Sequence, residues 1–445
     1  MRLNGLNYRF MVTTAIFVGA IFVASSVSAV LNLKVKVFKL RLDLYYLVAL
    51  SGAALLIAFK FITPAEAIKG LTLKASVNPL KILALFFSMT FISVYLDEAG
   101  LFRTIAAKAL KSSNGGQFKI ITVLYLLTSV LTVFTSNDII VLTFTPFICT
   151  FCKHSKVNPV PYLFTEFVAA NTFSMALIIG NPTNIYLASF AGIDFFTYLK
   201  VMILPTVAAG LVAYAVILLV FKKSLSKKIE SDGYDEPLKD KTATVVGVIA
   251  LSLAVALLSI SNLINIEMYI VSLVLACALL AFAIINAIHK KDKSASVTGA
   301  LIRLPYSLVP FLCSMFICVL ALDKCGFAGF LAEKLSGNPV IFFGVSSFLA
   351  ANVMNNIPMS VLFSAIAENL AGGARLSAVY ASIAGSNLGA YLTPVGALAG
   401  IMFSGLIRGH GIKFTPLTFI KYGALISAFT LAAALLTLLF TVNLA

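Results

Sequence analysis

The sequence contains no tryptophan, few acidic residues and no long polar segment. Its 445 residues include 17 Asp and Glu against 33 Lys and Arg, and the longest polar stretch covers only residues 222–241. Hydrophobic residues make up 60% of the chain, and the mean hydropathy is +1.02. This composition excludes an ordinary soluble protein and predicts an all-α polytopic membrane protein. We therefore expect the function to reside in the part embedded in the lipid bilayer.

The net charge of +16 does not indicate binding to nucleic acid. The basic residues are scattered between apolar runs and are not gathered with aromatic residues on one segment. They fit instead the bias of Lys and Arg toward cytoplasmic loops. Assigning alternate loops to two faces places 23 of the 33 basic residues on the face that carries 31–41, 98–119, 153–156, 222–241, 288–303 and 408–421. We predict that this face is cytoplasmic, in a plasma or inner membrane, with both termini outside the cytoplasm.

Cysteine and histidine offer little for catalysis. The six cysteines lie mostly within apolar runs, where they resemble small packing residues rather than a disulfide framework. Cys149 and Cys152, followed by His154, suggest a site for a soft metal or a thiophilic metalloid, which we keep as an alternative to packing. The three histidines are far apart, and no group has the spacing of a nucleophile or a metal site. We expect neither an enzyme nor a resident metal or cofactor.

The apolar runs form two similar halves. The segment 96–100 (LDEAG) is matched 226 residues later by 322–326 (LDKCG), and we expect Asp97 and Asp323 to end spans and cap the amphipathic helices that follow. Each half would cross the membrane five times, and because five is odd the halves are inverted relative to each other. We predict a first repeat at 1–221, a cytoplasmic linker at 222–241 and a second repeat at 242–445. The predicted spans cover about 10–30, 42–62, 79–96, 162–180, 198–221, 242–260, 268–287, 304–321, 378–391 and 417–442.

A polar turn interrupts the apolar sequence at the same place in each half. Ser136, Asn137 and Asp138 separate two apolar runs that are each shorter than the roughly 20 residues a spanning helix needs. We therefore predict that neither arm spans alone and that about 119–152 forms a re-entrant hairpin. Asn355 and Asn356 occupy the matching turn of a second hairpin at about 339–370. Irregular backbone at that depth must face protein or a water-filled cavity, so both turns are candidate binding sites.

Two predicted spans, at about 162–192 and 378–407, are also interrupted near a proline. Proline removes a backbone donor and disfavours helix in the residue before it. Such breaks free carbonyl groups and leave helix N-termini that favour an anion or a polar neutral solute. We predict a binding site of amides, hydroxyls and helix ends, made by the two turns together with Asn171, Asn181, Thr183, Asn184, Asn387, Thr393 and Pro394.

Acidic residues at membrane depth bear on the coupling ion. A buried carboxylate is costly when ionised, so it binds a proton or pairs with a cation. Asp138 is the first candidate for the proton-coupling group, and capping of the following helix is the alternative role. Glu166 is the second candidate, and the alternative is a position near the interface, held by Lys153 or Lys156.

At these breaks the sequence resembles the arsenite/antimonite efflux permeases of the ion transporter superfamily. More distantly, it is similar to the divalent anion/sodium symporters. The resemblance implies a ten-span elevator or rocking carrier, with substrate held between hairpin turns and broken spans. This chain departs from the family at Asn171 and Asn387, where efflux permeases often have an acid. The resemblance rests on 135–146 (TSNDIIVLTFTP), 181–185 (NPTNI), 355–358 (NNIP) and 385–399 (GSNLGAYLTPVGALA).

These observations favour a secondary active transporter that works by alternating access. The first hypothesis is export of arsenite or antimonite, a neutral metalloid acid, coupled to proton entry. The alternative is proton- or sodium-coupled transport of a carboxylate or another small anion, and an ion channel is the alternative of a different class. The expected partners are the small substrate and the bilayer. A homodimer and a cytoplasmic ATPase subunit docked on 222–241 are further hypotheses.

Overall fold

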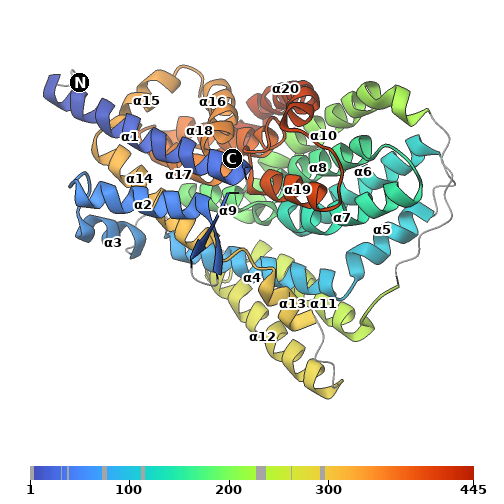
Figure 1. Cartoon of the computed structure of the whole chain (residues 1–445). Helices are drawn as coiled ribbons and strands as arrows, with labels where there is room; N and C mark the ends of the chain where they lie inside the picture. The colour runs from blue at the N-terminus through green and yellow to red at the C-terminus, as the bar shows by residue number, and fades with distance from the viewer. Residues whose placement is uncertain are drawn as a thin grey trace.

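The computed structural model describes residues 5–31, 33–37, 40–72, 78–111, 116–226, 237–261, 263–290 and 296–444, and nearly all of them are helical (Figure 1). The first half contains a β-hairpin of β1 (Lys34–Val37) and β2 (Leu40–Asp43). Its helices are α1 (Gly5–Val30), α2 (Leu44–Ala58), α3 (Pro64–Thr72), α4 (Pro79–Glu98), α5 (Leu101–Lys111), α6 (Gln117–Phe134), α7 (Asn137–His154), α8 (Pro159–Phe173), α9 (Pro182–Ala191) and α10 (Phe195–Leu225).

The second half repeats this order of long and short helices. Its helices are α11 (Lys241–Ser259), α12 (Met268–His289), α13 (Ser296–Ile302), α14 (Leu308–Lys324), α15 (Phe327–Leu335), α16 (Pro339–Met354), α17 (Asn356–Glu368), α18 (Gly372–Gly389), α19 (Leu398–Gly409) and α20 (Pro416–Thr441). Each half thus has two helices and a short helix, then a helix followed by the amphipathic α5 or α15, then a hairpin, a broken helix and a last long helix.

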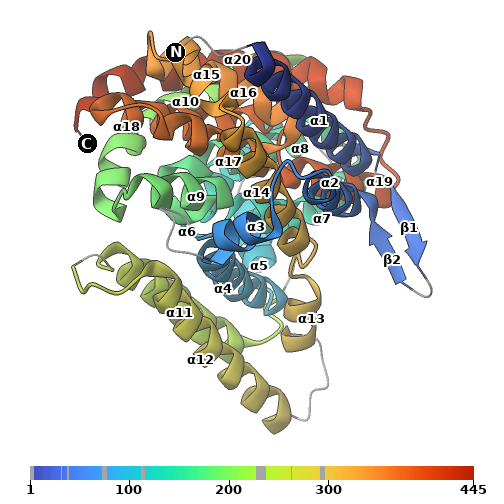
Figure 2. The same cartoon turned by 90° about the vertical axis from the view of Figure 1, so that its left-hand side faces the viewer.

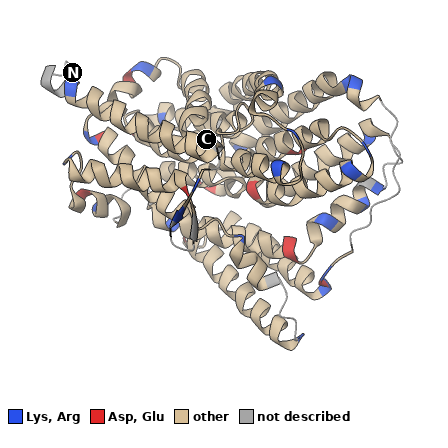
Figure 3. Cartoon of the chain, viewed as in Figure 1, with Lys and Arg blue, Asp and Glu red and all other residues tan. Residues whose placement is uncertain are grey.

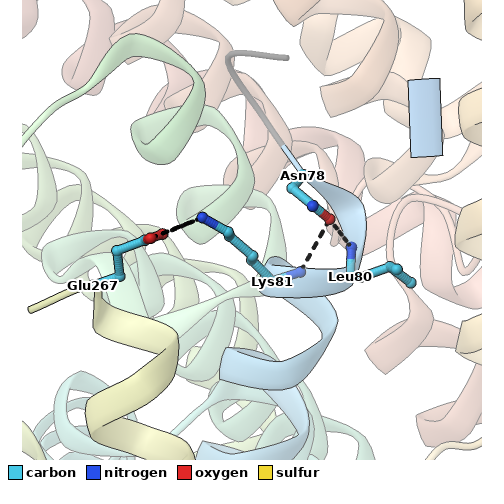
Figure 4. Close-up of polar contacts among 4 residues, drawn as sticks. All are labelled: Asn78, Leu80, Lys81 and Glu267. Atoms are coloured by element: carbon cyan, nitrogen blue, oxygen red, sulfur yellow. Dashed lines mark hydrogen bonds and ion pairs between the residues drawn. The ribbon is translucent and has the colours of Figure 1, made fainter. Parts of the chain in front are cut away.

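Asn-Pro pairs begin several of these helices. Asn78 accepts a hydrogen bond from the Leu80 N–H at 2.9 Å, and Pro79 is the first helical residue of α4 (Figure 4). Asparagine at the N-cap satisfies an unpaired helix donor, and proline loses nothing at the first position because its missing N–H would have no partner there. The same pairing begins α8, α9 and α16. The local sequence therefore fixes where these helices start.

Ion pairs between the halves fix the relative direction of one matched pair of helices, α4 and α14. Arg303, just before α14 begins, donates to a Glu98 oxygen at 2.6 Å at the end of α4. At the other end of α14, Lys324 donates to Glu66 of α3 at 2.8 Å. Since α3 precedes the start of α4, the matched helices α4 and α14 run in opposite directions.

Each of these helices packs mainly on the opposite half. The helix α4 lies against α11 and α12, whereas α14 lies against α1 and α2. Lys81 near the start of α4 donates to Glu267 just before α12 at 2.8 Å, so these two helices start on the same face (Figure 4). The pair α11 and α12 projects from the rest of the molecule (Figure 2). Charged residues are sparse over the helices that surround the hairpins (Figure 3).

The hairpins and broken helices form the body of the molecule. Both arms of the first hairpin, α6 and α7, pack against α8, and both arms of the second, α16 and α17, pack against α18. The halves interlock here, because α7 also packs against α19 and α17 against α9. Matched elements from the two repeats therefore enclose one central region.

The first arm of the first hairpin is longer than its apolar run. This arm, α6, has 18 residues and is long and apolar enough to be a candidate membrane span. The helix starts at Gln117, three residues ahead of the apolar run, and its first turn includes Phe118 and Lys119. The arms of the second hairpin are shorter, with 16 and 13 residues.

The predicted linker 222–241 is partly helical. The helix α10 continues to Leu225, and Lys241 is the first residue of α11. The centre of the linker, 227–236, lies outside the described residues, and it is also the centre of the segment on which an ATPase subunit is expected to dock. Residues 1–4 and 445 at the termini are also outside the described residues.

Candidate functional site

The first hairpin turns at Thr135 and Ser136, and α7 begins at Asn137. Ser136 is the N-cap residue, but its side chain does not accept a cap hydrogen bond. Its hydroxyl is buried without a hydrogen-bond partner among the described residues. The N-terminus of α7 therefore points into the protein with its cap oxygen unused, which leaves that end free for a ligand.

The orientation of the Asn137 amide follows from its neighbour. The Asn171 Nδ2 donates to the Phe167 carbonyl at 2.8 Å, so the Asn171 Oδ1 is the atom that faces the turn. Asn137 must present its Nδ2 to that oxygen, and it does so at 2.9 Å. The Asn137 Oδ1 is then left buried and without a partner among the described residues. The hydrogen bonds of Asn171 thus determine that the atom left unpaired at this turn is the oxygen of the Asn137 amide, an acceptor.

The break between α8 and α9 continues this network to the second repeat. Asn387 of α18 accepts hydrogen bonds from the Ser174 hydroxyl at 2.7 Å and from the Asn181 Nδ2 at 3.0 Å. Its own Nδ2 donates to the Asn184 Oδ1 at 2.7 Å. The N-cap of α9 is Asn181, which accepts from the backbone N–H of Thr183 at 3.1 Å.

These side chains form a closed amide network. Asn181, Asn184 and Asn387 bond to one another, and Asn171 is linked to them only through the Ser174 hydroxyl, which donates to its backbone carbonyl; all four side chains are 0% exposed. A buried polar group is costly unless it is hydrogen-bonded, and here the amide groups are satisfied by one another, by hydroxyls and by the backbone. The network therefore holds the broken helix of the first repeat against α18 of the second.

A second cluster joins the other turn to the other break. The Asn352 Oδ1 accepts from both the backbone N–H and the hydroxyl of Thr393, at 3.0 and 2.6 Å. The Asn355 Nδ2 donates to the Val395 carbonyl at 2.9 Å. Pro394 lies between these two contacts, in the segment that separates α18 from α19.

The second turn has unusual backbone geometry. Asn355 has φ +73° and ψ 155°, a conformation that residues other than glycine rarely adopt. Asn356 follows as the first residue of α17, and its Oδ1 is buried without a partner among the described residues. A pocket lined in part by Ile357, Ser360 and Pro182 extends from this turn to the start of α9.

The two acidic candidates lie in different environments. Asp138 is 8% exposed in the first turn of α7, and no hydrogen bond or ion pair joins it to another described residue. The prediction that it caps the helix by a side-chain bond is wrong, because α7 already begins one residue before it. Its negative charge still suits a helix N-terminus. Asp138 therefore remains available to a proton or a cation.

Glu166 is fully buried at 0% exposure in α8. Its carboxylate accepts from the Thr145 hydroxyl at 3.2 Å, and no ion pair to Lys153 or Lys156 is present among the described residues. The prediction of an interfacial residue held by lysine is wrong, because α7 and α8 pack closely over this position. Thr145 is seven residues beyond Asp138 on α7, or about 10 Å along the helix. The two carboxyl groups thus lie at different depths beside the same helix.

Ser174 was not singled out from the sequence, and its hydroxyl donates to Asn387. Asn352 and Ser386 belong to the polar stretches of the second turn and the second break but were not among the predicted site residues; they donate to the Gly389 carbonyl and to the Thr183 hydroxyl. Serine and asparagine that simply bond to their own helix look identical in sequence. Asp97 lies at the end of α4, as predicted, and accepts from Arg303 at 2.7 Å while fully buried. No hydrogen bond joins its side chain to a backbone N–H of α5 among the described residues, so the predicted cap is not seen.

The arrangement defines a class of protein. Candidate membrane spans surround broken helices, hairpin turns and buried amides, and acceptors without a partner among the described residues lie at an inward-facing helix end. This is the architecture of a multi-pass membrane transporter built from inverted repeats.

A family model described as a citrate transporter matches residues 44–385, and the chain belongs to this family. An arsenical pump membrane protein of Escherichia coli is 25% identical over 348 residues, covering 75% of this chain and 80% of the relative. The corresponding protein of strain K12 is 26% identical over 382 residues, covering 80% and 86%. The resemblance to the efflux permeases is thereby confirmed.

Other matches agree with this class. An uncharacterised transporter of Mycobacterium tuberculosis is 25% identical over 370 residues, covering 79% of this chain and 83% of the relative. The crystal structure of the YdaH transporter of Alcanivorax borkumensis, described as having an unusual topology, superimposes with a TM-score of 0.53. The superposition covers 96% of this chain and 97% of the YdaH chain at 15% sequence identity, so this likeness supports the fold alone.

Proposed function

We propose that this transporter exports a neutral polyhydroxy metalloid acid, arsenite or antimonite, in exchange for protons by alternating access. The observation that carries the proposal is the fixed orientation of the Asn137 amide, which leaves an acceptor oxygen unpaired beside the Ser136 hydroxyl and the Asp138 carboxyl group. Such acceptors require a ligand that donates hydrogen bonds. The curated relatives named as arsenical pump membrane proteins support the same substrate class.

A neutral hydroxy acid matches both kinds of group at this site. Its hydroxyl hydrogens suit the Asn137 oxygen, and its oxygens suit the unpaired N–H groups at the start of α7. A fully ionised oxyanion has no hydrogen to donate, so it would face the Asn137 oxygen and an ionised Asp138 with repulsion. No lysine or arginine is among the buried residues that the structure describes around this turn. This balance favours the neutral acid over an anion.

Asp138 is the proposed proton-coupling group. It is an acidic residue at the turn, it is nearly buried, and it has no partner among the described residues. Substrate and proton would then compete for one region of the site, which is the condition for exchange. Glu166, about 10 Å further along α7, is the second group that could hold a proton on the way.

Uptake into everted membrane vesicles tests this proposal. Arsenite or antimonite should accumulate when a proton gradient is imposed, and Asp138→Asn should abolish the dependence on pH while the protein remains folded. Asp194→Asn is a matched control, since Asp194 caps α10 away from the site. Unchanged pH-dependent uptake by Asp138→Asn would remove this residue from the mechanism.

Transport of a carboxylate or another small anion, coupled to protons or sodium, is the second candidate. The description of the matching family and the inward-facing starts of α7, α9 and α17 favour it. Thermal shifts with arsenite, citrate, succinate and sodium separate the two, because a ligand stabilises only the state that it binds. Flux that saturates and shows counterflow supports a carrier, whereas single-channel currents would support a channel.

A further inference from the structure

The β-hairpin between α1 and α2 contributes no described residue to the candidate site. It starts at Lys34, four residues after α1 ends, and α2 begins at Leu44 directly after it ends. The first of these helices is a candidate membrane span, and the second is a shorter apolar helix. The hairpin extends outward from the helical body beside α2 (Figure 2). Two membrane-embedded helices therefore hold it within a few residues of the edge of the bilayer.

Residues 33–36, which lead into and form most of the first strand, alternate between apolar and basic side chains, and all four are exposed. Leu33 is 41% exposed and Val35 is 38% exposed, and Lys34 and Lys36 alternate with them. Successive side chains of a strand point to opposite faces. An exposed apolar row and an exposed basic row on opposite faces of one strand fit a position where hydrocarbon meets charged headgroups.

The positive charge of the hairpin is only partly balanced by the acidic residues that the structure describes. The strand register pairs Lys34 with Asp43 and Lys36 with Arg41. The Lys34 Nζ lies 3.5 Å from Asp43, but both side chains are exposed, so this pair is weak. Lys36 forms no ion pair with a described residue. The remaining charge complements an anionic surface.

We propose that this hairpin binds the anionic phospholipid surface, with Leu33 and Val35 against the acyl boundary and Lys34 and Lys36 among the phosphate groups. Basic residues beside a membrane are attracted to anionic lipids within a Debye length. The hairpin thereby anchors the α1–α2 end of the molecule to one leaflet. This inference does not depend on the substrate of the transporter.

The matched loop of the second repeat provides an internal control. It joins α11 to α12 over residues 260–267, and it contains no Lys or Arg but one acid, Glu267. It lies on the opposite face, since α12 and α4 start together there through the contact of Lys81 with Glu267. Leu263 in this loop is 76% exposed. The loop has exposed apolar residues but lacks the positive charge, so it should show no preference for anionic lipid.

The absence of tryptophan from the chain makes a direct test feasible. Val35→Trp places a single tryptophan on the hairpin, and Leu263→Trp places one on the control loop. The full-length variants are reconstituted in vesicles of phosphatidylcholine alone or with about one-third phosphatidylglycerol, and quenching by lipids with brominated acyl chains is measured. Monodispersity on size exclusion verifies folding, and Leu33→Trp replaces Val35→Trp if that variant is unstable.

We expect the Val35→Trp emission to shift to the blue and its quenching to rise when anionic lipid is present. Adding Lys34→Gln and Lys36→Gln should lower the preference for anionic lipid by roughly an order of magnitude. The Leu263→Trp emission should be the same in both lipid mixtures. Equal quenching of Val35→Trp in vesicles with and without anionic lipid would overturn the proposal. So would a blue-shifted but unquenched emission, because protein, such as a second copy of the chain, would then cover this face.

Discussion

Asn171 and Asn387 occupy matched places in the two broken helices, but the structure predicts that they differ in importance. Replacing either residue by alanine removes the same atoms and leaves a cavity of similar size in a fully buried place. The difference in stability between Asn171→Ala and Asn387→Ala therefore isolates their hydrogen-bond partners. These partners differ. Asn171 accepts a hydrogen bond from Asn137 in the hairpin of its own repeat, whereas Asn387 donates one to Asn184 of the opposite repeat.

The magnitude follows from the groups that each replacement leaves unpaired. Asn171→Ala deprives only the Asn137 Nδ2 of its acceptor, since the Phe167 carbonyl belongs to a helix. Asn387→Ala deprives the Asn181 Nδ2 and the Asn184 Oδ1. Ser174 keeps a hydrogen-bond partner in Asn387→Ala, because its hydroxyl can still donate to the Asn171 backbone carbonyl.

One additional buried polar group is thus unpaired in Asn387→Ala. An unsatisfied buried group costs about 1–3 kcal/mol in soluble proteins, and polar contacts within membranes average about 0.6 kcal/mol. We expect Asn387→Ala to be less stable than Asn171→Ala by about 0.6–3 kcal/mol. Thermal unfolding of both purified variants in the same detergent measures this difference. Equal losses, or a larger loss in Asn171→Ala, would refute the assignment of partners.

Three further predictions concern the charged groups. Arg303→Gln should destabilise the protein strongly, by about 3–5 kcal/mol, because it leaves Asp97 buried without its closest cation. Lys324→Gln, the matched control, should change the unfolding midpoint little, since its pair with Glu66 is exposed. The pKa of Glu66 is lowered to about 2 by the Lys324 ammonium and by the Thr63 N–H and hydroxyl. The loss of stability in Lys324→Gln should therefore be the same at every pH between about 5 and 8. A loss that varies with pH in this range would mean that this ion pair titrates there. Glu166→Gln should retain the Thr145 contact and binding of substrate but slow proton-driven exchange, and unchanged exchange in vesicles would exclude Glu166 from the proton route.

Much of the fold could be predicted because its signals are local. Apolar runs, Asn-Pro starts such as Asn78-Pro79 and the repeat of 96–100 at 322–326 depend only on neighbouring residues. The extension of α6 to Gln117 was not predictable from hydropathy, since polar residues extend a helix beyond its apolar run. The local pattern therefore gives the existence of helices more reliably than their ends.

The side-chain partners could not be predicted, because they lie far apart in the sequence. Asp97 and Arg303 are separated by 206 residues, and Asn181 and Asn387 by the same number. No local pattern distinguishes a buried asparagine that bonds across the repeats from one that bonds to its own helix. The candidate residues themselves could be selected from composition, but their connection required the packing of α18 against α9.

The asymmetry between the repeats has a consequence for coupling. At the matched hairpin turns, Asp138 of the first repeat corresponds to Ile357 of the second. Only the first turn therefore carries a group that can exchange a proton, whereas the second carries the strained Asn355, which is tied to the Val395 carbonyl. Inverted repeats can supply two similar states of one fold. Under the proposed proton coupling, a single titratable turn would make the protonation of those two states unequal. If coupling resides in this difference, Ile357→Asp should add a second proton-binding turn and alter the number of protons exchanged per substrate. Reversal potentials of substrate flux at several pH values measure that number, and an unchanged ratio in a folded Ile357→Asp variant would place coupling elsewhere.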